Sequence, residues 1–246
     1  MKRIAVTLGV CLMVLGLATV QAADLTWDGT DMNWTEPDAD SFGAPTYDTG
    51  DNVTFTATGA GTVDLQSGTT TPSNITINST ANYIFDNGTV TATGTLTKEG
   101  GGNGLTTRFL TSLSAGTVNC KLDNLSVATL SDSADPIQLS GGTFMFDSAA
   151  TADLVLTQRP LVLGNANVYF HDNNDGKGML LDGPLSYSGT GNLNIYLNEG
   201  EKPSYAGTYE GASRISANIG DRSGGVTSVR PLNDGYWELT GTNTYT

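Results

Sequence analysis

One histidine limits the catalytic chemistry open to this chain. His171 is the only histidine among 246 residues, so a metal site built from several histidines is impossible. A Ser-His-Asp triad would have to run through that one residue. Neither a Gly-x-Ser-x-Gly nucleophile elbow nor a phosphate-binding loop occurs. We therefore assign no catalytic residue, no metal ligand and no cofactor-binding residue from the sequence.

The segment that follows the histidine has a distant likeness to a calcium-binding loop. It reads His171-Asp172-Asn173-Asn174-Asp175-Gly176, with Asp182 at the closing position. Such a loop should begin with Asp and close with Glu, and here both positions differ. We interpret it as an ordinary polar turn, with calcium binding as the alternative.

Acidic side chains dominate the first third of the chain. Between Asp24 and Thr97 there are ten acidic residues and no lysine or arginine. This zone is either a solvated face or a place where clustered carboxylates hold divalent cations. The carboxylates that could cluster are Asp24, Asp28, Asp31, Glu36, Asp38 and Asp40.

Two tryptophans lie within the same zone. Trp27 and Trp34 are suited to covering an open end of an apolar core. Alternatively, exposed faces of the two rings could stack on sugar rings, which makes them the candidate glycan-stacking residues.

Composition favours β-structure and disfavours two classes of partner. The chain has 25 acidic and 11 basic side chains, and a net charge of −14 disfavours nucleic acid and anionic lipid as partners. Only 38% of the residues are apolar, and 31 glycines accompany many Thr, Ser, Asn and Asp residues. Such residues form turns and solvated strand faces rather than helices.

Residues 1–22 have the pattern of a secretory signal peptide. Lys2 and Arg3 precede an apolar run, and Ala22 precedes the expected cut before Ala23. Removal of Lys2 and Arg3 leaves 25 acidic and 9 basic side chains, a formal charge of −16 instead of −14. The mature chain then keeps one cysteine, Cys120, which excludes an internal disulfide and predicts a small core residue.

The rest of the chain predicts many short strands separated by tight turns. No helical periodicity follows the signal segment, so a sandwich, a barrel or a β-solenoid is expected. The predicted strands are Asn52–Ala57, Asn74–Asn78, Tyr83–Phe85, Val118–Leu122, Ile137–Leu139, Thr143–Phe146, Asp153–Leu156, Leu161–Leu163, Val168–Phe170 and Leu193–Leu197.

Three patches resemble the autotransporter-associated β-strand repeat of secreted bacterial proteins. The first patch consists of a Trp-Asp-Gly start at Trp27, the pair Asn33-Trp34 and the strand at Gly50–Phe55. The second is the element Gly94-Thr95-Leu96-Thr97-Lys98-Glu99-Gly100. The third is the closing run from Trp237 to Thr246. Between Gly104 and Gly200 the repeat pattern is hard to find. The resemblance implies a right-handed parallel β-helix, exported to or beyond the surface of a Gram-negative bacterium. The middle of that helix is expected to be irregular, and a β-sandwich remains the alternative fold.

These sequence patterns predict a signal peptide at residues 1–22 and a solenoid at residues 23–246. Residues 23–58 would form a Trp-containing N-terminal cap, and residues 235–246 would begin a truncated repeat. Because a solenoid end exposes unpaired strand edges, we expect end-to-end self-association through the C-terminal end.

The function expected from these features is a secreted or cell-surface structural protein, adhesin-like and without catalytic activity. Its partner would be an extracellular glycan or another cell-surface molecule. The alternative is a carbohydrate-binding or polysaccharide-cleaving β-helix module, since pectin-lyase-like enzymes use this fold with a basic residue as catalytic base. The basic candidates form no recognisable pattern: Arg108, Arg159, Lys177, Arg214 and Arg222.

Overall fold

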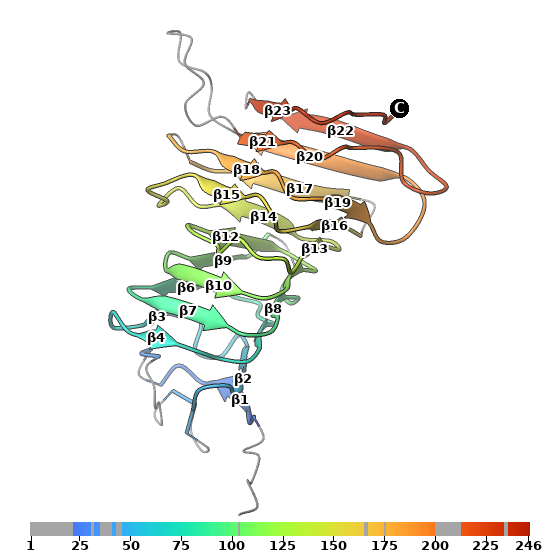
Figure 1. The fold of residues 1–246 in the computed structure, drawn as a ribbon. Helices are drawn as coiled ribbons and strands as arrows, with labels where there is room; N and C mark the ends of the chain where they lie inside the picture. Colours follow the sequence, from blue (N-terminus) through green and yellow to red (C-terminus); the bar gives the residue numbers. More distant parts are fainter. Residues whose placement is uncertain are drawn as a thin grey trace, which may run out of the picture.

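The chain folds into a parallel β-solenoid. A computed structural model describes residues 22–30, 32–34, 41–42, 46–102, 104–164, 167–174, 176–199, 213–233 and 236–246. The described residues form β-strands and no helix, and every strand pair in them is parallel. The coils stack along one axis from β1 at one end to β22 and β23 at the other (Figure 1). The predicted β-helix is confirmed, whereas a β-sandwich would require antiparallel pairs.

Two eight-stranded sheets form two faces of the coil. The first sheet contains β1 (Asp24–Trp27), β2 (Asn52–Phe55), β5 (Ile75–Ile77), β8 (Leu96–Lys98), β11 (Val118–Cys120), β13 (Ile137–Leu139), β16 (Leu161–Leu163) and β19 (Leu185–Tyr187). The second sheet contains β3 (Gly61–Asp64), β6 (Tyr83–Asp86), β9 (Thr106–Phe109), β12 (Asn124–Val127), β14 (Thr143–Phe146), β17 (Asn167–Asp172), β20 (Leu193–Glu199) and β22 (Thr227–Leu232).

The third face is divided into two smaller sheets. One contains β4 (Thr69–Thr70), β7 (Thr89–Ala92) and β10 (Ser112–Ala115). The other contains β15 (Leu154–Leu156), β18 (Met179–Leu181), β21 (Ser213–Ile215) and β23 (Trp237–Leu239). Along the first sheet, strands β2, β5, β8, β11, β13, β16 and β19 begin at residues 52, 75, 96, 118, 137, 161 and 185, so one coil takes 19 to 24 residues.

Alternate residues of each strand point into a shared apolar core. In β6, for example, Tyr83 and Phe85 are fully buried while Ile84 is half-buried on the outer face. Parallel pairing places equivalent inward residues of successive coils above one another, and the rings of Phe85 and Phe109 stack with centroids 4.4 Å apart. Cys120 is one of these inward residues and is fully buried, as the sequence predicts.

Aromatic side chains close the N-terminal end of the core. Trp27 and Trp34 have no exposed surface, and their rings pack edge-on against Phe42 at 5.2 and 6.0 Å. Trp34 also contacts Tyr47 and Phe55. The structure therefore places both tryptophans in a cap. Stacking on a glycan requires an exposed ring face, and neither Trp27 nor Trp34 has one, so that expectation is corrected.

The middle of the chain is regular on two faces and irregular on the third. Both eight-stranded sheets run without a break through residues 104–164, where the repeat pattern fades. On the third face, however, residues 128–135 form no strand, and this separates β10 from β15. The predicted irregularity is thus confined to one missing rung.

The C-terminal end of the second sheet is partly protected against strand addition. Leu193 N–H donates to Val226 O at 2.9 Å, so Ser228 and Arg230 bond towards β20 while Thr227, Val229 and Pro231 face the open edge. Thr227 N–H already donates to Asp221 Oδ1 at 2.8 Å, and proline has no N–H to offer. Among the described outward residues of β22, Val229 alone keeps a free N–H. The sequence predicts an open end and does not indicate this protection.

End-to-end association should therefore increase when Asp221 and Pro231, which protect this edge, are replaced. In the variant Asp221→Ala/Pro231→Val, positions 227 and 231 gain a free N–H beside that of Val229, and we expect more dimer and oligomer at a given concentration than in the parent protein. Sedimentation velocity over a hundredfold concentration range measures this. An unchanged distribution in a variant that still folds would show that β22 is not the associating edge.

Candidate functional site

An arginine, a serine and an aspartate from successive coils bond to one another on the outer face of the second sheet. Arg108 lies on β9, Ser126 is its register partner on β12, and Asp147 directly follows β14. Arg108 Nε and one terminal nitrogen donate to the two Asp147 carboxylate oxygens at 2.8 and 2.7 Å, and Ser126 Oγ donates to Oδ2 at 2.7 Å. Residues 39 positions apart are thereby joined across three coils.

The electrostatics of this cluster favour a fixed ion pair. Burial by itself raises the pKa of Asp147, but the bonds from Arg108, the Ala149 N–H and Ser126 outweigh it and hold the pKa below its ordinary value. The same hydrogen bond raises the pKa of Arg108. A carboxylate held in this way is a poor general acid or base at neutral pH.

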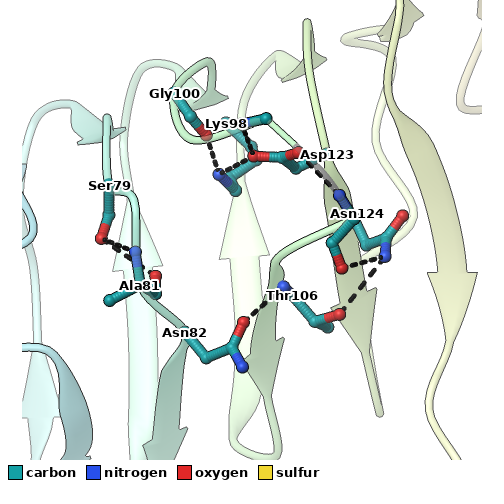
Figure 2. A network of polar contacts seen from close by, with 10 residues as sticks. Ser79, Ala81, Asn82, Lys98, Gly100, Thr106, Asp123 and Asn124 are labelled. Carbon is teal, nitrogen blue, oxygen red and sulfur yellow. Dashed lines mark hydrogen bonds and ion pairs between the residues drawn. The ribbon is translucent and has the colours of Figure 1, made fainter.

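A second charged pair lies at the corner between the first and second sheets (Figure 2). Lys98 Nζ is 3.4 Å from Asp123 Oδ2 and also donates to Gly100 O, and both side chains are almost fully buried. The glycine-rich turn wraps around the carboxylate, because Gly102 N–H donates to Oδ2 at 2.8 Å and Gly104 N–H to Oδ1 at 3.3 Å. Gly101 and Gly102 have φ of 119° and 74°, backbone that side-chain-bearing residues rarely adopt.

A lysine and a cysteine meet at this corner, and burial shifts the pKa of each. Burial lowers the pKa of Lys98, and Asp123 opposes that effect. Cys120 is the register neighbour of Lys98, and burial raises the pKa of its thiol to about 12. Since the thiolate is the nucleophilic form, Cys120 acts as a packing residue.

Arg159 replaces missing backbone contacts inside the stack. Its side chain is completely buried. The guanidinium donates to the carbonyls of Ala115 at 2.8 Å, Gly116 at 2.7 Å, Ser131 at 2.9 Å and Asp135 at 3.2 Å. These carbonyls belong to the end of β10 and to the residues that form no strand on the third face. Arg159 therefore joins the coil whose residues 128–135 form no strand on the third face to the neighbouring coils.

The remaining basic candidates are also placed by the structure. Arg222 donates to the carbonyls of Gly164 at 3.1 Å and Ser188 at 2.9 Å, two coil corners earlier in the stack. Arg214 on β21 pairs with Asp182 on the preceding coil, with Nε to Oδ1 at 3.0 Å. Lys177 is half-buried in the turn before β18. These side chains lie at separate corners and do not converge on one catalytic centre.

The calcium-like segment is an internal turn in the residues that can be described. Asn174 donates to the carbonyls of Asp147, Ser148 and Ala150, and Asp172 accepts from Asn174 N–H and from the Ser213 hydroxyl. Asp182 is bonded to Arg214, which lowers its pKa despite partial burial. Asp175 lies outside the described residues. These contacts support a polar turn rather than a cation site.

The acidic zone is only partly described. Asp24 accepts from Asn52 Nδ2 at 2.8 Å and Asp28 from the Thr30 hydroxyl at 2.7 Å, so each carboxylate is engaged locally. Asp31, Glu36, Asp38 and Asp40 lie outside the described residues, as does the predicted signal segment up to residue 21. Among the residues that the structure places, no group of three His, Cys, Asp or Glu side chains could hold a metal ion.

The outer face of the second sheet carries an aromatic ladder near its C-terminal end. Tyr169 on β17 and Tyr196 on β20 are register partners whose rings stack with centroids 4.6 Å apart. Arg230 on β22 lies 5.8 Å from the Tyr196 ring centroid, a cation–π distance. Both tyrosines are half-buried.

A shallow groove of about 450 Å³ lies on the third face, where the rung is missing. Sequence reasoning did not single out its residues. The available signal was an alternation of hydroxyl residues in two successive coils, Thr89-x-Thr91-x-Thr93 and Ser112-x-Ser114. The groove is lined by hydroxyl and carboxylate side chains, among them Thr91, Thr93, Ser114, Ser131, Ser133 and Asp135.

Comparisons with known proteins give no relative: no family model, no curated protein and no solved structure matches the chain. In the part of the chain that the structure describes, there is no helix long and apolar enough to cross a membrane.

Because of these ion pairs, we expect the free energy of unfolding to decrease at acid pH. Hydrogen bonds to the charged form lower the pKa of Asp147 and Asp182 in the folded protein. Their stabilisation is therefore complete above the ordinary aspartate pKa of ~3.9 and is lost as the pH falls through the folded values. Urea unfolding between pH 7 and pH 2 should show the free energy of unfolding decreasing below about pH 4.

The double variant Asp147→Asn/Asp182→Asn provides the comparison. It should be less stable than the parent at pH 7 and should lose less free energy of unfolding on acidification. Equal slopes for the parent and the variant would contradict the assigned ion pairs.

Proposed function

We propose that this chain is a secreted or cell-surface structural protein of adhesin type, exported by a Gram-negative bacterium, and that it has no catalytic activity. The signal-peptide pattern at 1–22 and the resemblance to autotransporter-associated repeats support the export and the location. The solenoid fold supports a structural role, because stacked coils give long, flat outer faces with few internal degrees of freedom.

One observation carries the structural part of the proposal. Four of the five basic residues that could have acted as a catalytic base, namely Arg108, Arg159, Arg214 and Arg222, bond to carboxylates or carbonyls of other coils. These hydrogen bonds join segments that are 32 to 44 residues apart in the sequence. A rigid scaffold requires such contacts, whereas an enzyme requires a group free to exchange protons with a substrate.

Carbohydrate binding is the second candidate function. The groove on the third face supports it, because hydroxyl and carboxylate groups converge there on a concave surface. Trp27 and Trp34, the glycan-stacking candidates of the sequence, are buried in the N-terminal cap. Polysaccharide cleavage has no comparable support, since Asp147 and Asp182 are each held by an arginine.

Expression of the full-length gene in a Gram-negative host tests the proposal. We expect the protein in the medium or on the cell surface, accessible to added protease and antibody, with Ala23 as its first residue. Microspheres coated with the purified protein should be retained on bacterial or host-cell surfaces more than microspheres coated with an acidic control protein of similar size. An intracellular product that begins at Met1, or retention equal to the control, would contradict the proposal.

A further inference from the structure

The missing rung on the third face creates a recess in an otherwise continuous stack. Strand β10 ends at Ala115, and residues 128–135 of the next coil pass over this face without pairing as a strand. They remain attached, because Ser131 N–H donates to Leu113 O at 2.9 Å and Leu113 N–H donates to Thr129 Oγ1 at 3.4 Å. The groove of about 450 Å³ at this place falls within the range of ~300–1,000 Å³ typical of small-ligand sites.

The base of the groove is rigid. Directly beneath it, the buried Arg159 guanidinium holds the carbonyls of Ala115, Gly116, Ser131 and Asp135 in one cluster. Asp132 fixes the rim in the same way, since its carboxylate accepts the Thr157 hydroxyl at 2.7 Å and the N–H groups of Thr157, Gln158 and Arg159. A preorganised recess loses little conformational entropy when a ligand enters.

The walls of the groove present hydroxyl groups in register. Ser114 on β10 is the register partner of Thr91 on β7, and Ser131 Oγ donates to Ser114 Oγ at 3.1 Å. Within the described residues, the hydroxyls of Thr91 and Thr93 have no hydrogen-bond partner. Asp135 accepts the Ser133 hydroxyl with one carboxylate oxygen, at 3.2 Å. The groove thus combines open hydroxyl donors with a carboxylate acceptor.

The charge of the groove restricts the ligand. Its two ionisable lining residues are Asp132 and Asp135, both acidic and exposed. The guanidinium below is completely buried and bonded to carbonyl oxygens, so it cannot bond directly to a ligand, and its single positive charge offsets only one of the two carboxylates. An anionic polysaccharide would meet like charge here, whereas a neutral molecule rich in hydroxyl groups matches both the donors and the acceptors.

We propose that this groove binds a neutral oligosaccharide. This inference rests on the proposed adhesive function and names the class of glycan and the residues that hold it. The hydroxyls of Thr91 and Thr93 donate hydrogen bonds to sugar hydroxyls and accept hydrogen bonds from them. Ser114 and Ser131 continue that row, and Asp135 accepts a hydrogen bond from a sugar hydroxyl. The rigid coil around Arg159 supports the recess.

Calorimetric titration of the purified full chain tests the proposal. The probes are neutral oligomers derived from glucan, xylan and mannan, with oligogalacturonate as the anionic probe and chitosan oligomers as the cationic probe. We expect at least one neutral oligomer to bind and oligogalacturonate not to bind. The variant Thr91→Val/Thr93→Val should raise the Kd for that oligomer at least tenfold, and Asp135→Asn should weaken binding as well.

The matched control is Thr54→Val/Thr76→Val. These two threonines are register partners on the outer face of the first sheet, half-buried like Thr91 and remote from the groove. The control should bind as the parent does, and both double variants should keep the parent's circular dichroism and melting temperature.

Several outcomes would overturn the inference: no neutral probe binds, oligogalacturonate or chitosan binds more tightly than the neutral oligomers, or the groove variant binds as well as the control.

Microsphere adhesion separates a failure of the groove inference from a failure of the proposed adhesive function. If groove variants that have lost oligosaccharide binding still adhere, or if the parent adheres and binds no probe, the adhesive function stands and the groove is not its site. If the parent does not adhere, the proposed function fails whatever the groove binds.

Discussion

The structure depends on one constraint, which is that the backbone of each coil in a parallel solenoid can pair only with the coil before it and the coil after it. Backbone hydrogen bonds run between coils, so the register of one strand fixes the register of the next. Inward side chains consequently stack in columns, as Phe85 and Phe109 do. Any position where the chain leaves the ladder must replace the lost backbone bonds by other means.

Charged side chains provide that replacement. Arg159 bonds to four carbonyls around the missing rung, Arg222 bonds to carbonyls at two corners, and Lys98 and Asp123 hold the glycine-rich turn. The groove exists because a rung is absent, and it keeps its shape because Arg159 bonds the surrounding backbone. The buried arginine and the proposed binding site thus both depend on the missing rung, the place where the chain departs from the regular solenoid.

Much of the architecture could be predicted from the sequence, because it depends on local patterns. Runs such as Thr143–Phe146 and Val168–Phe170 are rich in large apolar and aromatic residues and are flanked by turn-forming residues, and each lies in a strand. Strands β7 and β10 were missed because their inward residues are Val90, Ala92, Leu113 and Ala115, mostly small, and their outward residues are Thr and Ser. Such segments resemble solvated turns when read one at a time.

The contacts between coils could not be predicted in the same way. Arg108 and Asp147 are 39 residues apart, and Arg159 and Ala115 are 44 residues apart. Which residues meet depends on the length of every intervening coil, and those lengths vary from 19 to 24 residues. The sequence indicates that Trp27 and Trp34 are suited to covering an open end of the core, but it does not indicate that Phe42, Tyr47 and Phe55 pack around them.

The central claim is that buried polar side chains, and not the apolar core alone, hold the coils together. The most direct test compares the free energies of unfolding of Arg159→Met and Lys121→Met. Lys121 forms an exposed ion pair with Glu99 on the neighbouring coil, at 2.8 Å. Arg159→Met leaves four carbonyls without their donor and should lower the free energy of unfolding by ~3–5 kcal/mol, whereas Lys121→Met should lower it by less than ~1 kcal/mol. An Arg159→Met protein as stable as the parent, or more stable, would contradict the account.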